Sequence, residues 1–220
     1  MPPWLRQLWY NTVKVGMFAA YTGLLSERFI GGRNIPKSGP VLIVANHQSF
    51  IDPFFLGVAS PRPIIFLTRE TLHKNKLLSK FMNSLGSIPI DHRGFSRDGL
   101  QASLAALKEG KCLGVFPEGE RTYDGRLGDF KAGISLLLKR AKAPIVPAGI
   151  AGAYAFWPRH NKLPRLSPLF LRPTPATIGV SFGKPIDPAK YENLSREELM
   201  ADLRSAVAVE KAKAERIRRK

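Results

Sequence analysis

The chain has 220 residues, a length typical of one domain, and 44% of its residues are hydrophobic while 23% are charged. This composition excludes wholesale disorder. A single cysteine, Cys112, excludes both a disulfide framework and a Cys-x-x-Cys zinc site. The 34 lysines and arginines outnumber the 17 acidic residues, which gives a net charge of +17 and a surface that favours nucleic acid, anionic lipid or phosphorylated substrates.

Residues 1–30 are predicted to form an amphipathic helical segment that associates with a membrane surface. The stretch between Lys14 and Glu27 has 12 uncharged residues, whereas a bilayer-spanning helix needs roughly 20. Trp4 and Trp9 lie among basic residues, an arrangement that suits the headgroup region of a bilayer. The alternative is a helix that packs on the domain and extends its charges into solvent. Residues 1–26 do not show the order of regions that is typical of a signal peptide.

Short apolar runs rich in β-branched residues predict six strands, at 41–45, 64–67, 87–90, 112–116, 144–150 and 177–182. Helical patterns lie between them, at 53–59, 76–85, 100–107 and 130–138. This alternation predicts a single α/β domain over residues 31–194, with a largely parallel central sheet flanked by helices.

The end of the chain is predicted to contain a surface loop and a helix. Residues 157–175 are rich in proline and arginine, which favours the loop. Ser195 and Glu198 have the spacing of a capping box, so residues 195–220 are predicted to form a basic C-terminal helix. We expect its last residues to fray.

The block NHQSFID, residues 46–52, begins where the first predicted strand ends. Ligands of such sheets collect at the carboxyl ends of the strands. Pro53 suits the first turn of a helix, with Asp52 as the expected N-cap. The turn between them can bring the Asp52 carboxylate onto the His47 imidazole, which would fix the tautomer and support an imidazolium. The block alone also allows Asp52 to be a simple cap and His47 an ordinary loop histidine.

A second block, FPEGERT at 116–122, also follows a predicted strand directly. Gly119 would let the backbone approach a ligand, and Arg121 offers a forked donor suited to phosphate. Glu118 could orient that arginine or contact a hydroxyl. By itself the block is equally compatible with a turn held by an ordinary ion pair.

Two further segments add candidates. The segment GSIPIDHR, 86–93, ends in Arg93, which could bind phosphate but could equally be a solvated surface charge. The segment VPAGI, 146–150, carries Pro147 within an apolar strand, which implies an edge strand or a bulge. This strand could face an acyl chain or belong to the core.

In this order the four segments resemble the blocks of the glycerolipid acyltransferase family, of the 1-acylglycerol-3-phosphate acyltransferase type. That family shows N-H-x4-D, a strand ending in arginine, F-P-E-G-x-R and V-P-x-x-I. The resemblance covers about residues 35–155. It departs at two positions: His92 stands where the arginine is usual, with Arg93 one place later, and Glu120 replaces a small hydroxyl residue.

The resemblance implies transfer of an acyl group from acyl-CoA or acyl carrier protein to the free hydroxyl of 1-acylglycerol 3-phosphate, giving phosphatidic acid. His47 would remove the hydroxyl proton and Asp52 would hold the imidazole. The residues implied to bind the acceptor phosphate are Arg93, Glu118, Gly119 and Arg121. Pro147 would contact the acyl chain or serve the structure.

The same resemblance implies no metal and no cofactor beyond the acyl donor, and it places the protein on the cytoplasmic face of a membrane as a peripheral or monotopic enzyme. Another lysolipid or glycerol 3-phosphate remains an alternative acceptor. A basic nucleic-acid or lipid-binding module without catalysis is the alternative of a different class. A nucleic-acid partner is not expected, because the aromatic residues lie in apolar runs and the sequence contains no common reading motif. It also contains neither a G-x-S-x-G elbow nor a P-loop.

Overall fold

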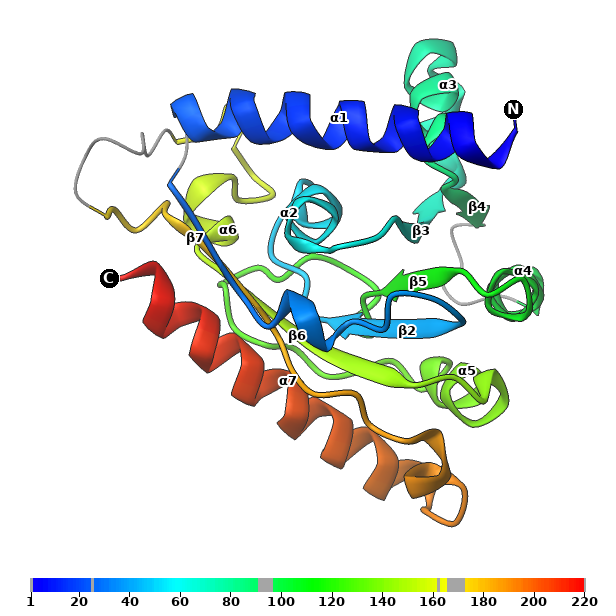
Figure 1. Cartoon of the computed structure of the whole chain (residues 1–220). Coiled ribbons are helices and arrows are strands. Elements are labelled where there is room, and N and C mark those ends of the chain that lie inside the picture. Colours follow the sequence, from blue (N-terminus) through cyan, green and yellow to red (C-terminus); the bar gives the residue numbers. More distant parts are fainter. Residues whose placement is uncertain (1, 25, 91–96, 162, 166–172, 220) are drawn as a thin grey trace.

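The computed structural model describes the whole chain except residues 1, 25, 91–96, 162, 166–172 and 220. Within the described residues, seven strands form one sheet in the order β1-β7-β6-β2-β5-β3-β4. Helices cover both faces of this sheet (Figure 1). The predicted single α/β domain is confirmed.

The strands are β1 (Glu27–Ile30), β2 (Val41–Ala45), β3 (Ile64–Arg69), β4 (Ile88–Ile90), β5 (Cys112–Val115), β6 (Ile145–Ala151) and β7 (Ile178–Phe182). All neighbours pair in parallel except β6 and β7, which are antiparallel, so the sheet is largely parallel as predicted. The six predicted strands are present. Strand β1 was not predicted, and it shows that the sheet begins before the boundary we expected at residue 31.

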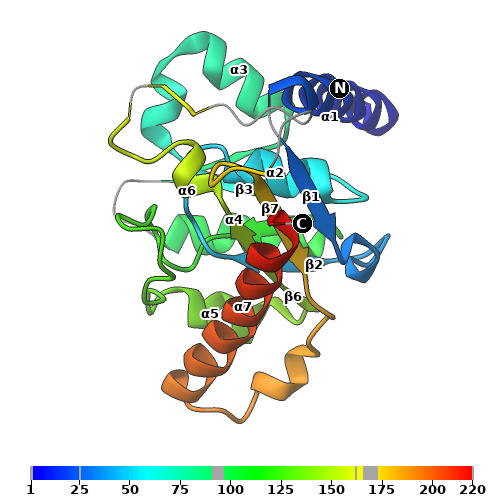
Figure 2. The ribbon, with the colours of Figure 1, turned by 90° about the vertical axis from the view of Figure 1, so that its left-hand side faces the viewer.

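The helices are α1 (Pro3–Leu24), α2 (Asp52–Ala59), α3 (Lys76–Ser84), α4 (Arg97–Lys108), α5 (Ile134–Ala141), α6 (Ala153–Phe156) and α7 (Arg196–Arg218). Two views at right angles place α1, α2 and α3 on one side of the sheet and α7 on the other (Figures 1 and 2). None of the described helices combines the length and the apolar character needed to cross a bilayer.

The core consists of two apolar clusters, one on each face of the sheet. Strand β2 contributes to both, because successive side chains of a strand point to opposite faces. Val41, Ile43 and Ala45 join the cluster that includes the buried Phe55 of α2, whereas Leu42 and Val44 join the cluster formed with α4, α5 and α7. All five side chains are fully buried, as expected for a central strand covered on both faces.

Pro147 lies in β6, which is an interior strand rather than an edge strand. The register changes beside it: Ala148 pairs with Phe182, whereas Ile145 bridges Ile186, so the segment after β7 contains one extra residue. The carbonyl of Pro147 accepts a backbone N–H from this segment at 2.8 Å. Since the N and O of a strand residue face the same side, the missing N–H of the proline faces the bulge. Of the two predicted placements, the structure shows the bulge.

Helix α7 begins with the predicted capping box. The Ser195 hydroxyl accepts from the backbone N–H of Glu198 at 3.2 Å, and the Glu198 carboxylate accepts from the backbone N–H of Ser195 at 2.8 Å. The helix runs to Arg218, so the fraying that we expected is not seen in the described residues.

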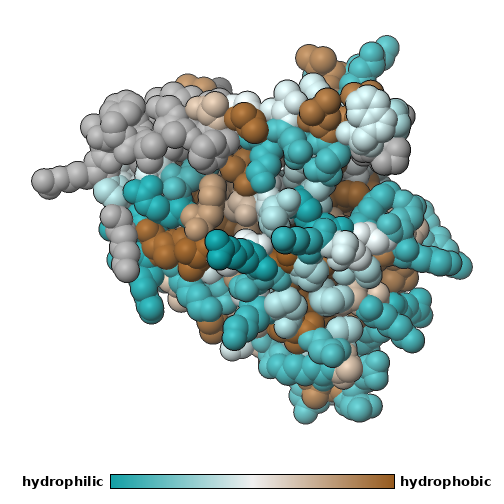
Figure 3. All heavy atoms as spheres, in the orientation of Figure 1, coloured by the Kyte–Doolittle hydropathy of each residue, from teal (hydrophilic) through white to brown (hydrophobic). Residues whose placement is uncertain are grey.

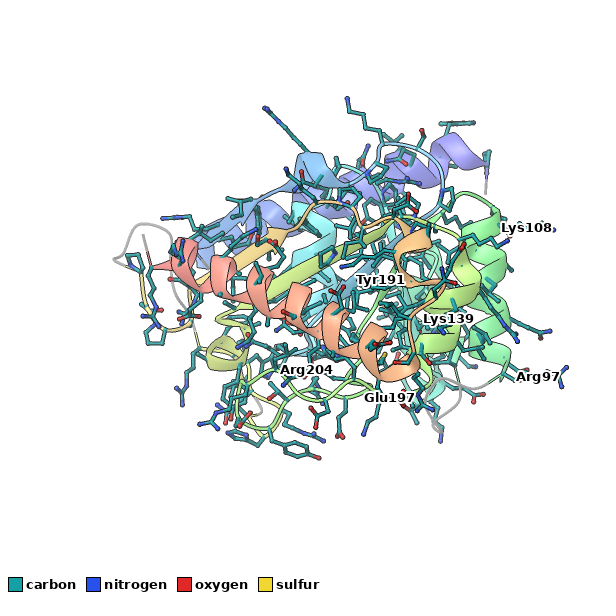
Figure 4. All side chains as sticks on the ribbon, turned by 90° about the horizontal axis from the view of Figure 1, so that it is seen from below. Arg97, Lys108, Lys139, Tyr191, Glu197 and Arg204 are labelled. Atoms are coloured by element: carbon teal, nitrogen blue, oxygen red, sulfur yellow. The ribbon has the colours of Figure 1, made fainter. Side chains whose placement is uncertain are left out.

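Helix α7 is an integral part of the domain rather than an appended element. Its leucines 199 and 203 and Val207 are fully buried in the core cluster, and it crosses β6 and β7 closely (Figure 4). The close approach depends on Gly149 of β6, where a Cβ atom would lie 2.1 Å from the backbone nitrogen of Lys211. The boundary that we expected at residue 195 therefore separates no independent unit.

The predicted loop over residues 157–175 follows the short helix α6, which was not predicted. Its described parts form neither helix nor strand, and residues 162 and 166–172 lie outside the described residues. Trp157 closes a local turn here by donating its indole N–H to the carbonyl of Asn161 at 3.1 Å.

Glu27, the first residue of edge strand β1, carries a buried carboxylate. Both of its carboxylate oxygens are buried, and within the described residues neither has a hydrogen-bond partner. Desolvation disfavours the charged form and raises the pKa of Glu27 from 4.5 to about 7. Because the folded pKa exceeds the unfolded one, this group's contribution to stability is fully present below about pH 4.5 and is lost as the pH rises through about 7.

Replacing Glu27 by glutamine should therefore flatten the pH dependence of the free energy of unfolding. Between about pH 5 and about pH 8 the wild type should lose on the order of 3 kcal/mol relative to the Glu27→Gln variant, since one pKa unit corresponds to about 1.4 kcal/mol. Urea unfolding of both proteins at the two pH values measures this difference. Equal losses in the two proteins would show that Glu27 titrates normally in the folded state.

Candidate active site

The turn between β2 and α2 brings His47 and Asp52 together, as the sequence predicts. The Nδ1 atom of His47 lies 2.8 Å from Oδ2 of Asp52. Asp52 is fully buried, while the His47 side chain keeps 18% of its surface exposed. With Nδ1–H donating to the carboxylate, we assign the lone pair to Nε2, which can then accept a proton. The pair thus has the geometry of a general base oriented by a carboxylate.

Asp52 does not have the N-cap role that we expected. It is the first residue of α2, and Ile51 occupies the cap position without a side-chain hydrogen bond. The Asp52 carboxylate instead turns back over the loop, where Oδ2 accepts the backbone N–H groups of Gln48 at 2.5 Å and Ser49 at 2.8 Å. The same oxygen therefore binds the imidazole and holds the shape of the turn.

Aromatic stacking fixes the plane of the imidazole. The His47 ring lies on the Phe116 ring with centroids 4.1 Å apart and an angle of 14° between the planes. Phe116 in turn stacks on Phe66 of β3 at 5.7 Å. The hydrogen bond to Asp52 and the stacking together leave the ring little rotational freedom.

Glu118 is buried beneath the turn and holds its backbone. Its Oε1 accepts the backbone N–H of His47 at 2.7 Å, and its Oε2 accepts the backbone N–H of Gly128 at 2.7 Å. Burial raises the pKa of Glu118, and the two backbone hydrogen bonds act in the opposite direction. Both oxygens are thus engaged with backbone, which favours a positioning role over the predicted contact with phosphate.

The Gly128 end of this arrangement is anchored from α7. Arg204 donates through Nε to the carbonyl of Gly128 and through Nη2 to that of Leu127, both at 3.1 Å (Figure 4 labels Arg204). A Cβ atom at position 128 would lie 2.9 Å from Oε2 of Glu118, so a larger residue there would displace the carboxylate. The helix on the far face of the sheet therefore supports the backbone of His47 through Glu118.

The FPEGERT segment runs alongside the turn and brings Gly119 and Arg121 to it. The backbone N–H of Thr122 donates to the carbonyl of His47 at 2.9 Å. Gly119 has a φ of +72°, in the left-handed region that favours glycine, so the segment reverses direction at this residue. The backbone at Arg121 therefore lies next to that of His47.

Two predicted site residues remain, Arg93 and Pro147. Arg93 lies in the segment 91–96, outside the described residues. Pro147 packs on the α7 face of the sheet: a Cβ atom at Gly183 would lie 2.9 Å both from its Cγ and from a carboxylate oxygen of Glu210. Phe116 and Phe66, which stack beneath His47, belong to the opposite cluster with α2. Of the two roles predicted for Pro147, the packing supports the structural one.

Three polar residues of the NHQS segment were not predicted as functional. Asn46 exchanges two hydrogen bonds with the backbone of Ile150, at 2.7 and 3.0 Å, and so joins the ends of β2 and β6. Gln48 donates to the carbonyl of Gly125 at 2.9 Å, and Ser49 donates to that of Trp157 at 2.9 Å. These polar residues follow a fully apolar strand directly, which was the available signal for a role in holding neighbouring loops.

An apolar hollow of about 50 Å³ lies beside the turn, between the sheet and helices α1, α2 and α3. It is lined by Tyr10, Pro53, Phe54, Ile64, Phe66, Met82, Leu85 and Ser87. Pro53 directly follows Asp52, so the hollow adjoins the pair formed by His47 and Asp52. In the described part of the chain no cluster of three or more histidine, cysteine or acidic residues could hold a metal ion.

Replacing Glu118 by glutamine tests its positioning role. One of the two backbone N–H groups would then face an amide NH2 group, which should lower the free energy of unfolding by about 1–3 kcal/mol and lower kcat by displacing the turn. Urea unfolding and steady-state kinetics measure both effects, with Glu197→Gln on the exposed start of α7 as the control. Unchanged stability and kcat with a raised acceptor KM would instead support a direct contact between Glu118 and substrate.

Known proteins share this sequence and this fold. A family model described as Acyltransferase matches residues 27–151. The 1-acyl-sn-glycerol-3-phosphate acyltransferase of Bacillus subtilis is 27% identical over 79% of this chain and 80% of its own length. The protein of the same name from Saccharomyces cerevisiae is 34% identical over 58% of this chain and 43% of its own length.

A solved structure agrees with these matches. The crystal structure of the 1-acyl-sn-glycerophosphate (LPA) acyltransferase PlsC from Thermotoga maritima superposes with a TM-score of 0.79 at 25% identity. The match covers 98% of this chain and 82% of that one. Since the family model spans more than half of the residues and the fold agrees over nearly all of them, the chain belongs to the acyltransferase family.

Proposed function

We propose that this acyltransferase moves a fatty acyl group from an acyl thioester to the free hydroxyl of 1-acylglycerol 3-phosphate, giving phosphatidic acid. The observation that carries the proposal is the buried hydrogen bond between Asp52 and His47, which leaves Nε2 of the ring as a base. The names of the Bacillus subtilis and Saccharomyces cerevisiae relatives support this acceptor.

The reaction is a direct transfer. Nε2 of His47 takes the proton of the acceptor hydroxyl while its oxygen attacks the thioester carbonyl, and Asp52 stabilises the imidazolium that forms. The carbon–sulfur bond then breaks, and the imidazolium returns its proton to the departing sulfur, so a free thiol and a new ester are released. General-base catalysis of this kind contributes typically about 10²- to 10⁴-fold to the rate.

Charge and apolar surface around the turn suit the two ends of such an acceptor. Arg121 offers a forked donor to the phosphate, and Arg93 is a further candidate. The backbone N–H of Gly119 already donates to the carbonyl of Phe116 at 3.0 Å, so this glycine serves the turn. The net charge of +17 attracts anionic lipid and an anionic donor, either acyl-CoA or acyl carrier protein. The apolar hollow beside Pro53 and Phe54 offers a surface to a fatty chain next to the base.

Product analysis by mass spectrometry tests the proposal. The purified protein would receive palmitoyl-CoA or palmitoyl carrier protein together with lysophosphatidic acid, lysophosphatidylcholine or glycerol 3-phosphate. We expect phosphatidic acid, with kcat/KM for lysophosphatidic acid about tenfold or more above the other two. The choline ester leaves the charged phosphate site poorly matched, and glycerol 3-phosphate has no acyl chain to contact the apolar surface.

Other products would contradict the proposal in distinct ways. A preference for another acceptor would show that lysophosphatidic acid is not the principal substrate. Free fatty acid as the sole product would indicate a thioesterase. Salt-sensitive binding of RNA or DNA without acyl transfer would favour the non-catalytic alternative.

We further propose that the protein associates peripherally with the cytoplasmic face of a membrane through helix α1. One side of α1 contacts the domain: Trp9 donates to the Ser84 hydroxyl at 2.9 Å, and Tyr10 accepts the backbone N–H of Ile64 at 3.3 Å. Large apolar side chains of α1 and α3 remain exposed, namely Trp4, Leu5, Leu8, Trp9, Val15 and Leu77. Hydrophobic residues accordingly appear along the upper edge of the molecule, over α1 and α3 (Figure 3).

Charged substitutions on α1 test this association. A Trp4→Glu, Val15→Glu double variant should weaken binding to phosphatidylglycerol-containing vesicles by about tenfold or more, since each buried apolar side chain contributes about 1.5–3 kcal/mol. Vesicle co-sedimentation measures the binding. Val209→Glu, an exposed position on α7 across the sheet, is the matched control. Equal binding by the wild type and the Trp4→Glu, Val15→Glu variant would show that α1 only packs on the domain.

A further inference from the structure

Glu120, which stands where the resembling family has a small hydroxyl residue, belongs to a cluster with Tyr123 and Arg159. Oε2 of Glu120 lies 3.4 Å from Nη1 of Arg159 and 3.3 Å from the hydroxyl of Tyr123. The guanidinium carbon of Arg159 lies 3.9 Å from the centre of the Tyr123 ring. Glu120, the residue of the FPEGERT segment that differs from the family pattern, is therefore paired with a second arginine. This is Arg159, which comes from the loop after α6.

This second arginine contacts the segment that is hydrogen-bonded to the backbone of His47. Nη1 of Arg159 also donates to the carbonyl of Arg121 at 3.3 Å. That carbonyl belongs to the same peptide unit as the backbone N–H of Thr122, which donates to the carbonyl of His47 at 2.9 Å. A single peptide unit thus separates the guanidinium from the backbone of His47, and Arg159 reaches the same segment that carries Arg121.

Within the described residues, most N–H groups of Arg159 are not used in hydrogen bonds. Its side chain keeps 29% of its surface exposed, and within the described residues its Nε and Nη2 groups have no hydrogen-bond partner. Stacking on Tyr123 holds the guanidinium plane without using an N–H group. The contact with Glu120 is long for a charge-assisted hydrogen bond, and the Glu120 side chain is 43% exposed, so an incoming anion can replace it.

We propose that Arg159 is a second phosphate-binding residue of the acceptor site, beside Arg121, with Tyr123 holding its guanidinium in place and Glu120 pairing with it until the phosphate binds. The inference rests on the proposed function and deepens it. A forked, always charged donor matches the oxygens of a phosphate monoester. The site then has two cations near His47 whatever the position of Arg93.

Steady-state kinetics of the full chain test this role, with lysophosphatidic acid in mixed micelles and palmitoyl-CoA as donor. Arg159→Ala should raise KM for lysophosphatidic acid about tenfold or more, while kcat and the donor KM change less than about twofold. The inhibition constant of sn-glycerol 3-phosphate, a soluble competitor for the same phosphate site, should rise in parallel. Arg159→Lys keeps the charge but not the forked geometry. Its KM and inhibition constant should lie between those of the wild type and of Arg159→Ala.

The matched control is Arg126→Ala, which removes the same charge from the neighbouring loop between β5 and α5. Arg126 is 89% exposed and pairs loosely with Asp124 at 3.7 Å, so its loss should leave all four constants unchanged. This comparison separates a specific phosphate contact from a general loss of positive charge.

The outcomes that overturn the inference differ from those that overturn the function. An active wild type whose Arg159→Ala variant keeps the same KM and inhibition constant would overturn the inference alone. A variant with lower kcat, altered donor KM and normal acceptor KM would show that Arg159 only braces the loop, which also overturns it. A wild type that does not acylate lysophosphatidic acid would overturn both.

Discussion

One oxygen of a buried carboxylate determines the geometry of this site. Oδ2 of Asp52 accepts the Nδ1–H group of His47 and the backbone N–H groups of Gln48 and Ser49. A carboxylate with no exposed surface needs such donors, because burial without them is costly. The chain can supply all three only by turning tightly between β2 and α2. The same requirement therefore fixes the turn, the orientation of the imidazole and the position of Nε2.

The rest of the fold supports that turn from several directions. The parallel strands β2 and β5 end side by side, so the loops that follow them meet at one edge of the sheet. Glu118, from the loop after β5, binds the backbone of His47, and Arg204 of α7 holds the other end of this connection at Gly128. Elements distant in sequence are thus joined to the base through three polar contacts, of which the two made by Glu118 are half-buried and the one made by Arg204 is exposed. Together these contacts hold the loop that carries His47 in one conformation, so a polar loop can present a rigid base.

Local sequence signals predicted the elements well where the pattern was strong. The apolar runs predicted six of the strands, and the spacing of Ser195 and Glu198 predicted the capping box of α7. Strand β1 was missed because its sequence, Glu-Arg-Phe-Ile, has only two apolar residues, and pairing with β7 makes it a strand. The N-cap assignment of Asp52 was wrong because a tertiary donor set, the turn and the imidazole, competes with the helix amides for its carboxylate.

The candidate site shows the same division between local and tertiary information. The spacing of His47 and Asp52 predicted their contact, and the order of the blocks predicted that Gly119 and Arg121 would reach them. The role of Glu118 as a backbone support depends on Gly128, and the position of Arg159 depends on the loop after β6. Neither partner is marked by spacing in the sequence, because both contacts exist only once the loops meet at the edge of the sheet. The placement of Pro147 likewise became definite only with the register of β6 and its bulge.

The measurement that tests the account most directly is thiol release from palmitoyl-CoA, with and without lysophosphatidic acid, by the wild type and by His47→Ala and Asp52→Asn variants. The account predicts release that depends on the acceptor in the wild type. It predicts a fall of about 10²- to 10⁴-fold in His47→Ala and a marked fall in Asp52→Asn, because the asparagine no longer holds the imidazole in the tautomer that leaves Nε2 free. Acceptor-dependent release that persists undiminished in His47→Ala would show that the base lies elsewhere.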